Sequence, residues 1–338
     1  MHIQHNISLK PYNTFGINVF AKLFASFNSI ELLKEQIELQ PSNIPLLILG
    51  GGSNVLFTQN FDGLVLKNEL KGIELLDEDD NYYYVKAAAG ENWHQFVLHC
   101  IANNYAGIEN LSLIPGSIGA TPMQNIGAYG VELVDVFDSL EAVDFATGSL
   151  LKFDKDTCKF GYRDSTFKQT WKGKLIITHV YLNLTKINHK LSYDYAALKE
   201  ELQRRNIQNP GIADISNAVI AVRQSKLPDP EILGNAGSFF KNPEITVEHL
   251  SRIQTIFPDI PHFNTSDGFV KIPAGWLIEN RGWKGKKVGN CGMHERQALV
   301  MVNYGKATGD EILKLANNII DDIHAHFGIK LSPEVNIL

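Results

Sequence analysis

Residues 114–130 read IPGSIGATPMQNIGAYG, a run with four glycines, two prolines and mostly small side chains. Such a composition has little propensity for helix or strand. Loops of this length are uncommon inside compact domains and usually carry function. The run can pass close to a large planar or phosphate-bearing ligand, because few side chains separate its backbone from the ligand. A purely structural crossover is the alternative.

A second glycine-rich turn, Gly50-Gly51-Gly52-Ser53-Asn54, follows the apolar run IPLLIL of residues 44–49, which is typical of a buried strand. Successive backbone N–H groups in such a turn can bind an anion. A Rossmann loop fits poorly, because its third glycine would fall on Val55, and a P-loop would need a Gly-Lys-Ser/Thr sequence. A plain tight turn stays open for this segment alone. Together, the two glycine-rich loops predict a bulky dinucleotide cofactor held by main chain.

Length and composition exclude several classes of protein. The 338 residues suggest about two domains, at roughly 150 residues each. The 31 basic and 37 acidic residues give a net charge of −6, without the basic surface that nucleic-acid binding needs. Cys100, Cys158 and Cys291 lie far apart, which indicates reduced thiols, and His324 and His326 would point to different faces of a helix.

From these features we expect a cytoplasmic monomer that binds no metal, nucleic acid or membrane. The N-terminus has no signal region, and no apolar run approaches the ~20 residues of a membrane helix. The modest charge and the absence of a coiled-coil repeat favour the monomer.

The coarse pattern is that of an α+β protein, with a polar, irregular break near residues 186–212. Apolar side chains at helical spacing predict a helix over residues 91–104. A helix is also expected over residues 195–204, another capped by Asp214, and a last one that begins at the capping box of Thr308 and stops at Gly328. Short strands are expected at 55–57, 64–66, 73–76 and 82–87 and between about 134 and 185, with the acidic run 77–81 as a solvated hairpin tip, whereas the last third begins with loops.

Four further motifs contain reactive or charged groups. Arg163 in Gly161-Tyr162-Arg163-Asp164-Ser165 presents a fork suited to a carboxylate or phosphate, although an Arg–Asp structural pair stays open. Ser238 lies in residues 234–243, which are not a nucleophile elbow because Phe240 occupies the position of its last glycine. Lys226 begins the polar loop of residues 226–230. For Glu334, near the C-terminus, a solvated tail is the alternative.

In one order and spacing, these motifs closely resemble the UDP-N-acetylenolpyruvoylglucosamine reductases, the flavoenzymes of bacterial peptidoglycan precursor synthesis. The resemblance extends from Asn13-Thr14-Phe15 to the C-terminus and rests on six stretches: residues 50–54, 114–130, 162–165, 226–230, 234–243 and 333–335. Each stretch alone is weakly specific, and the ordered set is highly specific.

The resemblance implies an α+β fold: an FAD-binding domain of the p-cresol methylhydroxylase type, with two α+β subdomains, followed by an α+β substrate-binding domain. The FAD-binding domain would span residues 1–187, with subdomains at about 1–66 and 67–187. Residues 188–338 would hold a tyrosine-loop insertion and the substrate-binding domain, whose tail, 329–338, would return to the active site.

The same resemblance implies non-covalent FAD between the two glycine-rich loops and NADPH as co-substrate. The tyrosine that closes over the nucleotide sugar would be Tyr193, with Tyr195 as the alternative. The implied FAD-binding residues are Gly50, Gly51, Gly52, Ser53, Asn54, Pro115, Gly116, Ser117, Gly119, Ala120, Thr121, Gln124, Asn125, Gly127, Ala128, Tyr129 and Gly130, and those for the UDP-sugar are Tyr193, Lys226, Asn242, Lys284 and Gln297.

The implied reaction reduces UDP-N-acetylglucosamine enolpyruvate to UDP-N-acetylmuramate. Hydride addition to the methylene carbon places negative charge on the neighbouring carbon and the carboxylate, and Arg163 suits this charge because its own is permanent. Glu334 would act as a protonated acid or orient Arg163. Ser238 would be the proton donor, since a carbanion is basic enough to take a proton from a hydroxyl.

Two alternatives belong to other classes of function. An FAD-dependent sugar or alcohol oxidase of the same fold would not need Arg163, Ser238 and Glu334 together. A catalytically silent nucleotide-sugar-binding homologue would not need to keep all three either. The intact set therefore favours the reductase.

Overall fold

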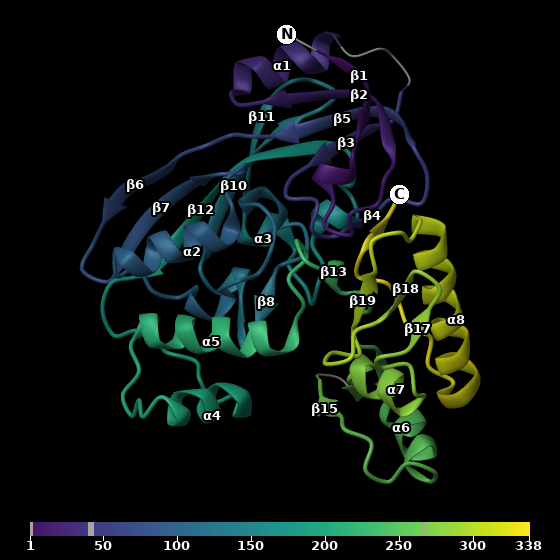
Figure 1. The fold of residues 1–338 in the computed structure, drawn as a ribbon. Coiled ribbons are helices and arrows are strands. Elements are labelled where there is room, and N and C mark those ends of the chain that lie inside the picture. Colours follow the sequence, from purple (N-terminus) through teal and green to yellow (C-terminus); the bar gives the residue numbers. More distant parts are fainter. Residues whose placement is uncertain (1–2, 40–43, 266–267) are drawn as a thin grey trace. The chain divides into compact units, whose positions relative to one another are not determined.

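The computed structural model describes residues 3–39, 44–265 and 268–338, and its chain divides into two compact units (Figure 1). The first unit comprises Met1–Ile7, Ala21–Gly52 and Asp62–Ser225; the second comprises Ser8–Phe20, Ser53–Phe61 and Lys226–Leu338. The functional boundary predicted at 187/188 stays a prediction. By contacts, residues 188–225 belong to the first unit.

The first unit contains a four-stranded sheet in the order β1-β2-β5-β3, formed by β1 (Gln4–Ser8), β2 (Phe20–Phe27), β5 (Phe61–Asn68) and β3 (Leu46–Leu49). β3 and β5 pair in parallel, with Leu49 opposite Lys67. Apolar side chains of β2 and β5 form a core with helix α1 (Ile30–Leu39), including Phe27, Leu33 and Leu66. The strand predicted from residues 44–49 is confirmed over Leu46–Leu49 and leads into the turn at Gly50; of its residues only Leu49 is fully buried, and the other three are half-buried.

The second sheet of this unit is antiparallel, in the order β11-β10-β12-β7-β6. Its strands are β6 (Ile73–Glu78), β7 (Tyr82–Ala88), β10 (Phe137–Asp144), β11 (Leu150–Asp154) and β12 (Leu175–Thr185). β6 and β7 form the predicted hairpin, but only residues 79–81 make its tip, because Asp77 and Glu78 extend β6 and pair with Tyr84 and Tyr83. β12 is an eleven-residue strand, longer than the pattern predicted, because β10 pairs with residues 175–182 and β7 with residues 179–185.

Helix α2 (Trp93–Ala102) packs on this sheet and confirms the helix predicted over residues 91–104 (Figure 1). Trp93, Phe96, Val97 and Cys100 are buried, as the apolar stripe requires. The Asn92 side chain caps the helix by accepting from the Gln95 N–H. Shorter elements complete this region: η2 (Glu109–Leu111), η3 (Ile118–Ala120), β8 (Gly127–Ala128), β9 (Val131–Glu132), η4 (Leu133–Asp135), α3 (Lys155–Cys158) and η5 (Thr166–Lys168).

Helices α4 (Ala196–Arg204) and α5 (Ile212–Lys226) follow in the first unit and share an apolar core. The helix predicted over residues 195–204 is confirmed. The prediction that Asp214 is an N-cap is wrong, because α5 already begins at Ile212. From within the first turn, the Asp214 carboxylate accepts a hydrogen bond of 2.9 Å from the Gly211 N–H. Asp214 therefore stabilises the N-terminus of α5 as its third residue and not as the residue before it.

The second unit is built on a four-stranded antiparallel sheet in the order β13-β19-β18-β17. Its strands are β13 (Gly234–Ser238), β17 (Lys287–Val288), β18 (Cys291–Met293) and β19 (Val300–Asn303). Helix α8 (Gly309–Phe327) contacts β18 and is capped as predicted, by the box of Thr308 and Glu311 and by left-handed Gly328. The unit also contains η1 (Lys10–Tyr12), β14 (Glu244–Thr246), α6 (Val247–Gln254), β15 (Phe263–Asn264), β16 (Phe269–Lys271) and α7 (Ala274–Asn280).

The C-terminal tail is paired main chain. Strand β20 (Asn336–Ile337) pairs in parallel with β4 (Val55–Leu56), the strand predicted directly after the first glycine-rich turn. Within the described ranges, no helix combines the length and apolar character that a membrane span requires.

Candidate active site

The two glycine-rich loops lie against each other in the first unit. A Cβ atom added at Gly51 would stand 2.9 Å from Cα of Gly116, and one added at Gly50 would overlap Oγ of Ser117. Gly51 therefore needs glycine because the two backbones approach so closely, whereas at Gly50 the neighbour is the Ser117 side chain. The Trp93 N–H donates to the Gly116 carbonyl at 3.0 Å and ties the second loop to the start of α2.

This junction fits an anionic group. Within the part of the chain that the structure describes, the N–H groups of Gly51 and Ser117 donate to no acceptor. Gly52 and Gly116 have φ angles of +62° and +121°, which other residues rarely adopt. Backbone N–H groups presented by such turns form concave anion sites. The loops thus suit the diphosphate of a dinucleotide such as FAD.

Asn125 and Thr121, two of the predicted cofactor residues, use their side chains to shape the second loop. Asn125 Nδ2 donates to Oε2 of Glu132 at 2.7 Å, and its Oδ1 accepts from the Val134 N–H at 3.0 Å. Thr121 Oγ1 donates to the Ile118 carbonyl at 2.7 Å. Both residues are buried. Their side chains therefore hold the loop's shape, which leaves the backbone as the surface for a ligand.

Arg163 is oriented by the same loop. It lies at the tip of a two-residue turn with φ of +52°, across which Gly161 and Asp164 exchange backbone hydrogen bonds of 3.0 and 3.2 Å. Arg163 Nη2 donates to the Gly127 carbonyl at 2.7 Å. The Asp164 carboxylate accepts from the Gln169 side-chain amide. The glycine-rich loop therefore helps to direct the guanidinium through the Gly127 carbonyl.

Arg223, which the sequence analysis did not single out, adds a second cation near Arg163. Its Nε is buried and has no hydrogen-bond partner among the described residues. Burial lowers the pKa of Arg223, Tyr129 opposes this shift, and the charge of Arg163 lowers the pKa further. A buried charge without a counter-charge is destabilising, so this position favours an anionic ligand. Arg223 follows Val219 by four residues and so lies on the predicted apolar face of α5. An arginine is unusual on such a face, and this was the signal in the sequence that could have identified it.

His94 borders the same cluster as a neutral group. Its Nδ1 accepts from the Leu113 N–H at 3.0 Å, which requires an unprotonated nitrogen. Burial lowers the pKa of His94, and the charge of Arg223 lowers it further. The positive charge of the cluster therefore comes from its two guanidinium groups.

The two candidate tyrosines lie in different surroundings. Tyr193 is half-buried against the core of α4 and α5. Tyr195 is 57% exposed and meets the ring of Tyr129 edge-on, with 5.6 Å between the ring centroids. Both tyrosines are therefore close to the end of the second glycine-rich loop, and Tyr193 is the one set into a core.

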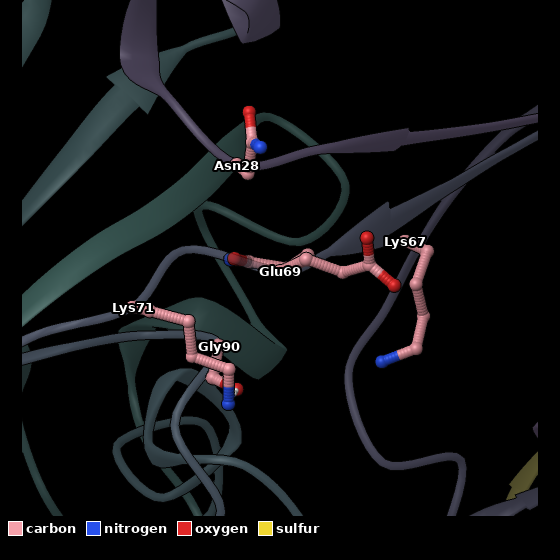
Figure 2. A pocket seen from close by; sticks show the side chains of 6 residues that line it. Asn28, Lys67, Glu69, Lys71 and Gly90 are labelled. Atoms are coloured by element: carbon pink, nitrogen blue, oxygen red, sulfur yellow. Dashed lines mark hydrogen bonds between the residues drawn. The ribbon is translucent and has the colours of Figure 1, made fainter.

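A cavity of about 570 Å³ opens near the end of β5, and its lining includes Lys67, Glu69, Lys71 and Gly90 (Figure 2). Lys71 Nζ donates to the Gly90 carbonyl at 2.9 Å. Lys67 stands opposite Leu49, the residue before the first glycine-rich turn. Burial lowers the pKa of Lys67. Lys67, which was not predicted as a site residue, is therefore a half-buried cation on the strand that pairs with the one before that turn.

In the second unit, Ser238 ends strand β13 opposite Val300. The pairing shifts register between Asn235 and Ser238, and Gly237 has φ of +70°. The Gly237 N–H donates to Oδ1 of Asn235 at 2.9 Å, which stabilises the irregularity. Such bulges re-aim side chains near functional sites. The sequence predicted a loop here; that prediction is wrong because main-chain pairing with β19 outweighs the low strand propensity of glycine.

Glu334 adjoins the strand that carries Ser238. Its N–H donates to the Phe239 carbonyl at 2.8 Å, and Pro333 forms a bridge with Phe240. Asn54 Nδ2 donates to the Glu334 carbonyl at 3.4 Å. The solvated-tail alternative is therefore wrong for this segment. The structure brings Ser238, Glu334 and Asn54 onto neighbouring stretches of chain.

Two predicted substrate residues have structural contacts as well. Asn242 Oδ1 accepts from the Ala274 N–H at 2.9 Å, at the start of α7. Gln297 Oε1 accepts from the Leu299 N–H at 3.3 Å, and Leu299 leads into β19. Each amide thus holds a neighbouring segment in place with its oxygen.

The two predicted substrate lysines lie at the surface of the second unit. Lys284 forms an ion pair of 2.8 Å with Glu279. Lys226 is exposed at the end of α5. A phosphate that approaches Lys284 would compete with Glu279 for the amine, so its interaction would depend on ionic strength.

Comparison with known proteins assigns the parts of the chain. Residues 22–154 match the sequence model of an FAD binding domain, and residues 229–338 match that of the C-terminal domain of UDP-N-acetylenolpyruvoylglucosamine reductase. The reductase of Flavobacterium johnsoniae is 50% identical over 100% of both chains. That of Pseudomonas aeruginosa is 46% identical over 100% of this chain and 99% of its own. The crystal structure of the Thermus caldophilus reductase shares the fold, with a TM-score of 0.69, 21% identity and coverage of 100% of this chain and 99% of its own.

An α+β fold with an FAD-binding domain defines the chain as an FAD-dependent oxidoreductase, as the sequence predicted. The full-length matches then specify it further: the chain belongs to the UDP-N-acetylenolpyruvoylglucosamine reductase family. The resemblance on which the prediction rested is confirmed.

Proposed function

We propose that this protein reduces UDP-N-acetylglucosamine enolpyruvate to UDP-N-acetylmuramate, with NADPH as the source of electrons. The observation that carries the proposal is the full-length family match together with intact Arg163, Ser238 and Glu334. An oxidase or a silent binding homologue would not need these three groups together.

Bound FAD would supply the hydride that adds to the enolpyruvyl double bond. The groups proposed to hold its diphosphate are the N–H groups of Gly51 and Ser117, which have no acceptor among the described residues and lie where the two glycine-rich loops meet. Such a site needs no basic surface, in agreement with the net charge of −6. Residues 1–187 would hold the cofactor and residues 188–338 the sugar nucleotide.

Arg163 would stabilise the negative charge that develops on the substrate's carboxylate side. The Gly127 carbonyl accepts a 2.7 Å hydrogen bond from its guanidinium, and a donor held in this way needs little reorganisation during the reaction. Arg223 would add charge of the same sign, because its buried Nε has no acceptor among the described residues. This double cation supports an anionic transition state.

Ser238 would donate the proton, and Glu334, on the adjoining segment of chain, would help to stabilise the enolate. Main-chain bonds on both sides hold this part of the second unit, through Val300 and Phe239. A serine hydroxyl suffices as an acid, because the carbanion it protonates is a strong base. Glu334 would then act as a protonated acid or orient the guanidinium of Arg163.

The test is NADPH oxidation by the purified holoenzyme with and without the enolpyruvyl UDP-sugar. We expect a yellow protein whose NADPH consumption depends on the sugar and whose product is UDP-N-acetylmuramate. A protein loaded with FAD that leaves the sugar unchanged would contradict the proposal. Sedimentation of the holoenzyme would test the expected monomer, and fractionation of the source cells would test the expected cytoplasmic location without membrane or nucleic-acid partners.

A further inference from the structure

We propose that Asn110 is a positioning residue that fastens the tyrosine loop, residues 191–195, to the second glycine-rich loop. The inference rests on the proposed function, because it gives Tyr193 its role over the sugar nucleotide. It adds a residue that touches neither FAD nor substrate and acts through the two segments that do.

Asn110 is fully buried in the short helix η2. Its Nδ2 donates to the Ser192 carbonyl at 2.6 Å and to the Tyr129 carbonyl at 3.1 Å. One amide group therefore holds two segments that lie more than sixty positions apart in sequence, as the separation of Tyr129 and Ser192 shows. Its Oδ1 is buried without a partner in the described ranges, so the donors explain why an amide occupies this position.

Ser192 strengthens the same junction from the other side. Its Oγ donates to the Tyr129 carbonyl at 3.2 Å, so this carbonyl accepts from both Asn110 and Ser192. A Cβ atom at Gly130 would stand 3.1 Å from Ser192 Oγ, which shows how closely the loops meet. The last residues of the glycine-rich loop and the tyrosine loop are thus joined by three hydrogen bonds around one buried amide.

The arrangement gives Asn110 a specific effect on substrate binding. Tyr193 directly follows Ser192, so the bond from Asn110 to the Ser192 carbonyl restricts the backbone that carries the tyrosine. A loop held in its binding conformation loses less entropy when the substrate binds. Because Tyr129 lies in the proposed FAD loop, a cofactor that orders this loop would also order the tyrosine loop.

Ser216 provides a matched control for a general loss of stability. The hydroxyls of Ser112 and Ser216 form a buried hydrogen bond of 2.8 Å that ties the region of Asn110 to α5. Ser216→Ala removes a buried hydrogen bond nearby without touching the tyrosine loop. Any effect of Asn110→Ala that Ser216→Ala reproduces is therefore a general loss of stability.

The experiment combines steady-state kinetics of the holoenzyme with a double-mutant cycle. We expect Asn110→Ala to raise KM for the enolpyruvyl UDP-sugar about tenfold, or about 1.4 kcal/mol, with little change in kcat. In a Tyr193→Phe background the same substitution should have a much smaller effect, because it acts through Tyr193. Ser192→Ala removes only the hydrogen bond to the Tyr129 carbonyl, so it should raise KM less than Asn110→Ala does. It also replaces Asn110→Ala in the experiment if that variant fails to fold. Ser216→Ala should leave KM unchanged.

Two kinetic results would overturn the proposal: equal increases in KM with and without the Tyr193 hydroxyl, or equal effects of Asn110→Ala and Ser216→Ala. Hydrogen exchange provides a readout independent of turnover. FAD should slow exchange in residues 188–195 of the wild type and leave it fast in Asn110→Ala; unchanged protection in the variant would also overturn it. A wild-type holoenzyme that does not reduce the sugar would contradict the proposed function instead. The exchange measurement would still show whether Asn110 couples the FAD loop to the tyrosine loop.

Discussion

The candidate catalytic residues of the two units are held in different ways. In the first unit, Arg163 sits on a left-handed turn, and its side chain donates a hydrogen bond to the Gly127 carbonyl. In the second unit, Ser238 and Glu334 sit on main chain that pairs with Val300 and Phe239. A side-chain bond disappears with a single substitution, whereas a ladder survives it. Substitutions of Ser238 or Glu334 should therefore remove a chemical group and leave the backbone in place. Substitutions of Arg163 should remove the group and also change how this part of the site is held.

The largest effect is expected for Ser238→Ala. Loss of a general acid typically slows a reaction by 10²–10⁴, so we expect turnover of the enolpyruvyl sugar to fall about a thousandfold. Because the strand is held by its backbone, stability and the rate of flavin reduction by NADPH should not change. Stopped-flow absorbance resolves the two half-reactions. Equal slowing of both would remove the proton-donor role.

Arg163→Met should lower kcat about a hundredfold, because an oriented donor at a developing negative charge is lost. Arg163→Lys should recover little of this, since an ammonium cannot reproduce the planar fork that Gly127 orients. Steady-state assays of both variants measure the effect. Full rescue by lysine would show that charge alone matters and that the geometry of the first unit does not.

Gly51→Ala should weaken FAD binding by about tenfold or more, roughly 1.4 kcal/mol, because its Cβ would stand 2.9 Å from Cα of Gly116. Gly211→Ala is the matched control in the same unit, since the nearest atom to its Cβ would be 3.7 Å away. Titration of the apoprotein by flavin fluorescence compares the two. Equal FAD affinity in both variants would argue against the cofactor lying at the contact of the loops.

Arg223→Met should stabilise the protein without ligands, by about 1–3 kcal/mol, because it removes a half-buried charge whose buried Nε has no acceptor in the described ranges. Turnover of the sugar should fall at the same time. Urea unfolding of the apoprotein checks the first effect and the NADPH assay the second. A destabilised variant would mean that Arg223 has a structural counter-charge.

The smallest effect concerns pH. The folded-state pKa of His94 lies below its ordinary 6.5, mainly because of burial, so the unfolded chain binds the proton more readily. Its contribution to stability is therefore complete above about pH 6.5 and is lost as the pH falls below that value. His94→Gln should make the stability of the protein less dependent on pH below 6.5, as followed by thermal unfolding. If the pH dependence of stability is unchanged in the variant, groups other than His94 cause the loss of stability at low pH.

Most elements with local signals were predictable from the sequence. The helix from Gly309 to Phe327 follows from a capping box, an apolar stripe and a terminal glycine, all within one segment. The turn after β3 was recognisable because three glycines follow an apolar run. The strand that ends at Ser238 was not, because its residues favour loops and only pairing with β19 extends them.

The candidate site was predictable in its residue types and less so in its contacts. Arg163, Ser238 and Glu334 were found from motifs, whereas Arg223 and Asn110 were missed. Asn110 has no unusual feature in the sequence, and Arg223 has only its place on an apolar helix face; the roles proposed for both come from burial and from groups distant in the chain. Local patterns contain no information about such partners.

By itself, the sequence determined the helix stripes and caps, the places where glycine frees the backbone, and the family to which the chain belongs. The tertiary structure alone decided that Gly51 meets Gly116, that Gly127 directs Arg163 and that Phe239 holds Glu334. Caps and stripes arise from interactions a few residues apart, which composition and spacing encode directly. The other contacts join distant segments, and their geometry is set by how whole sheets and helices pack.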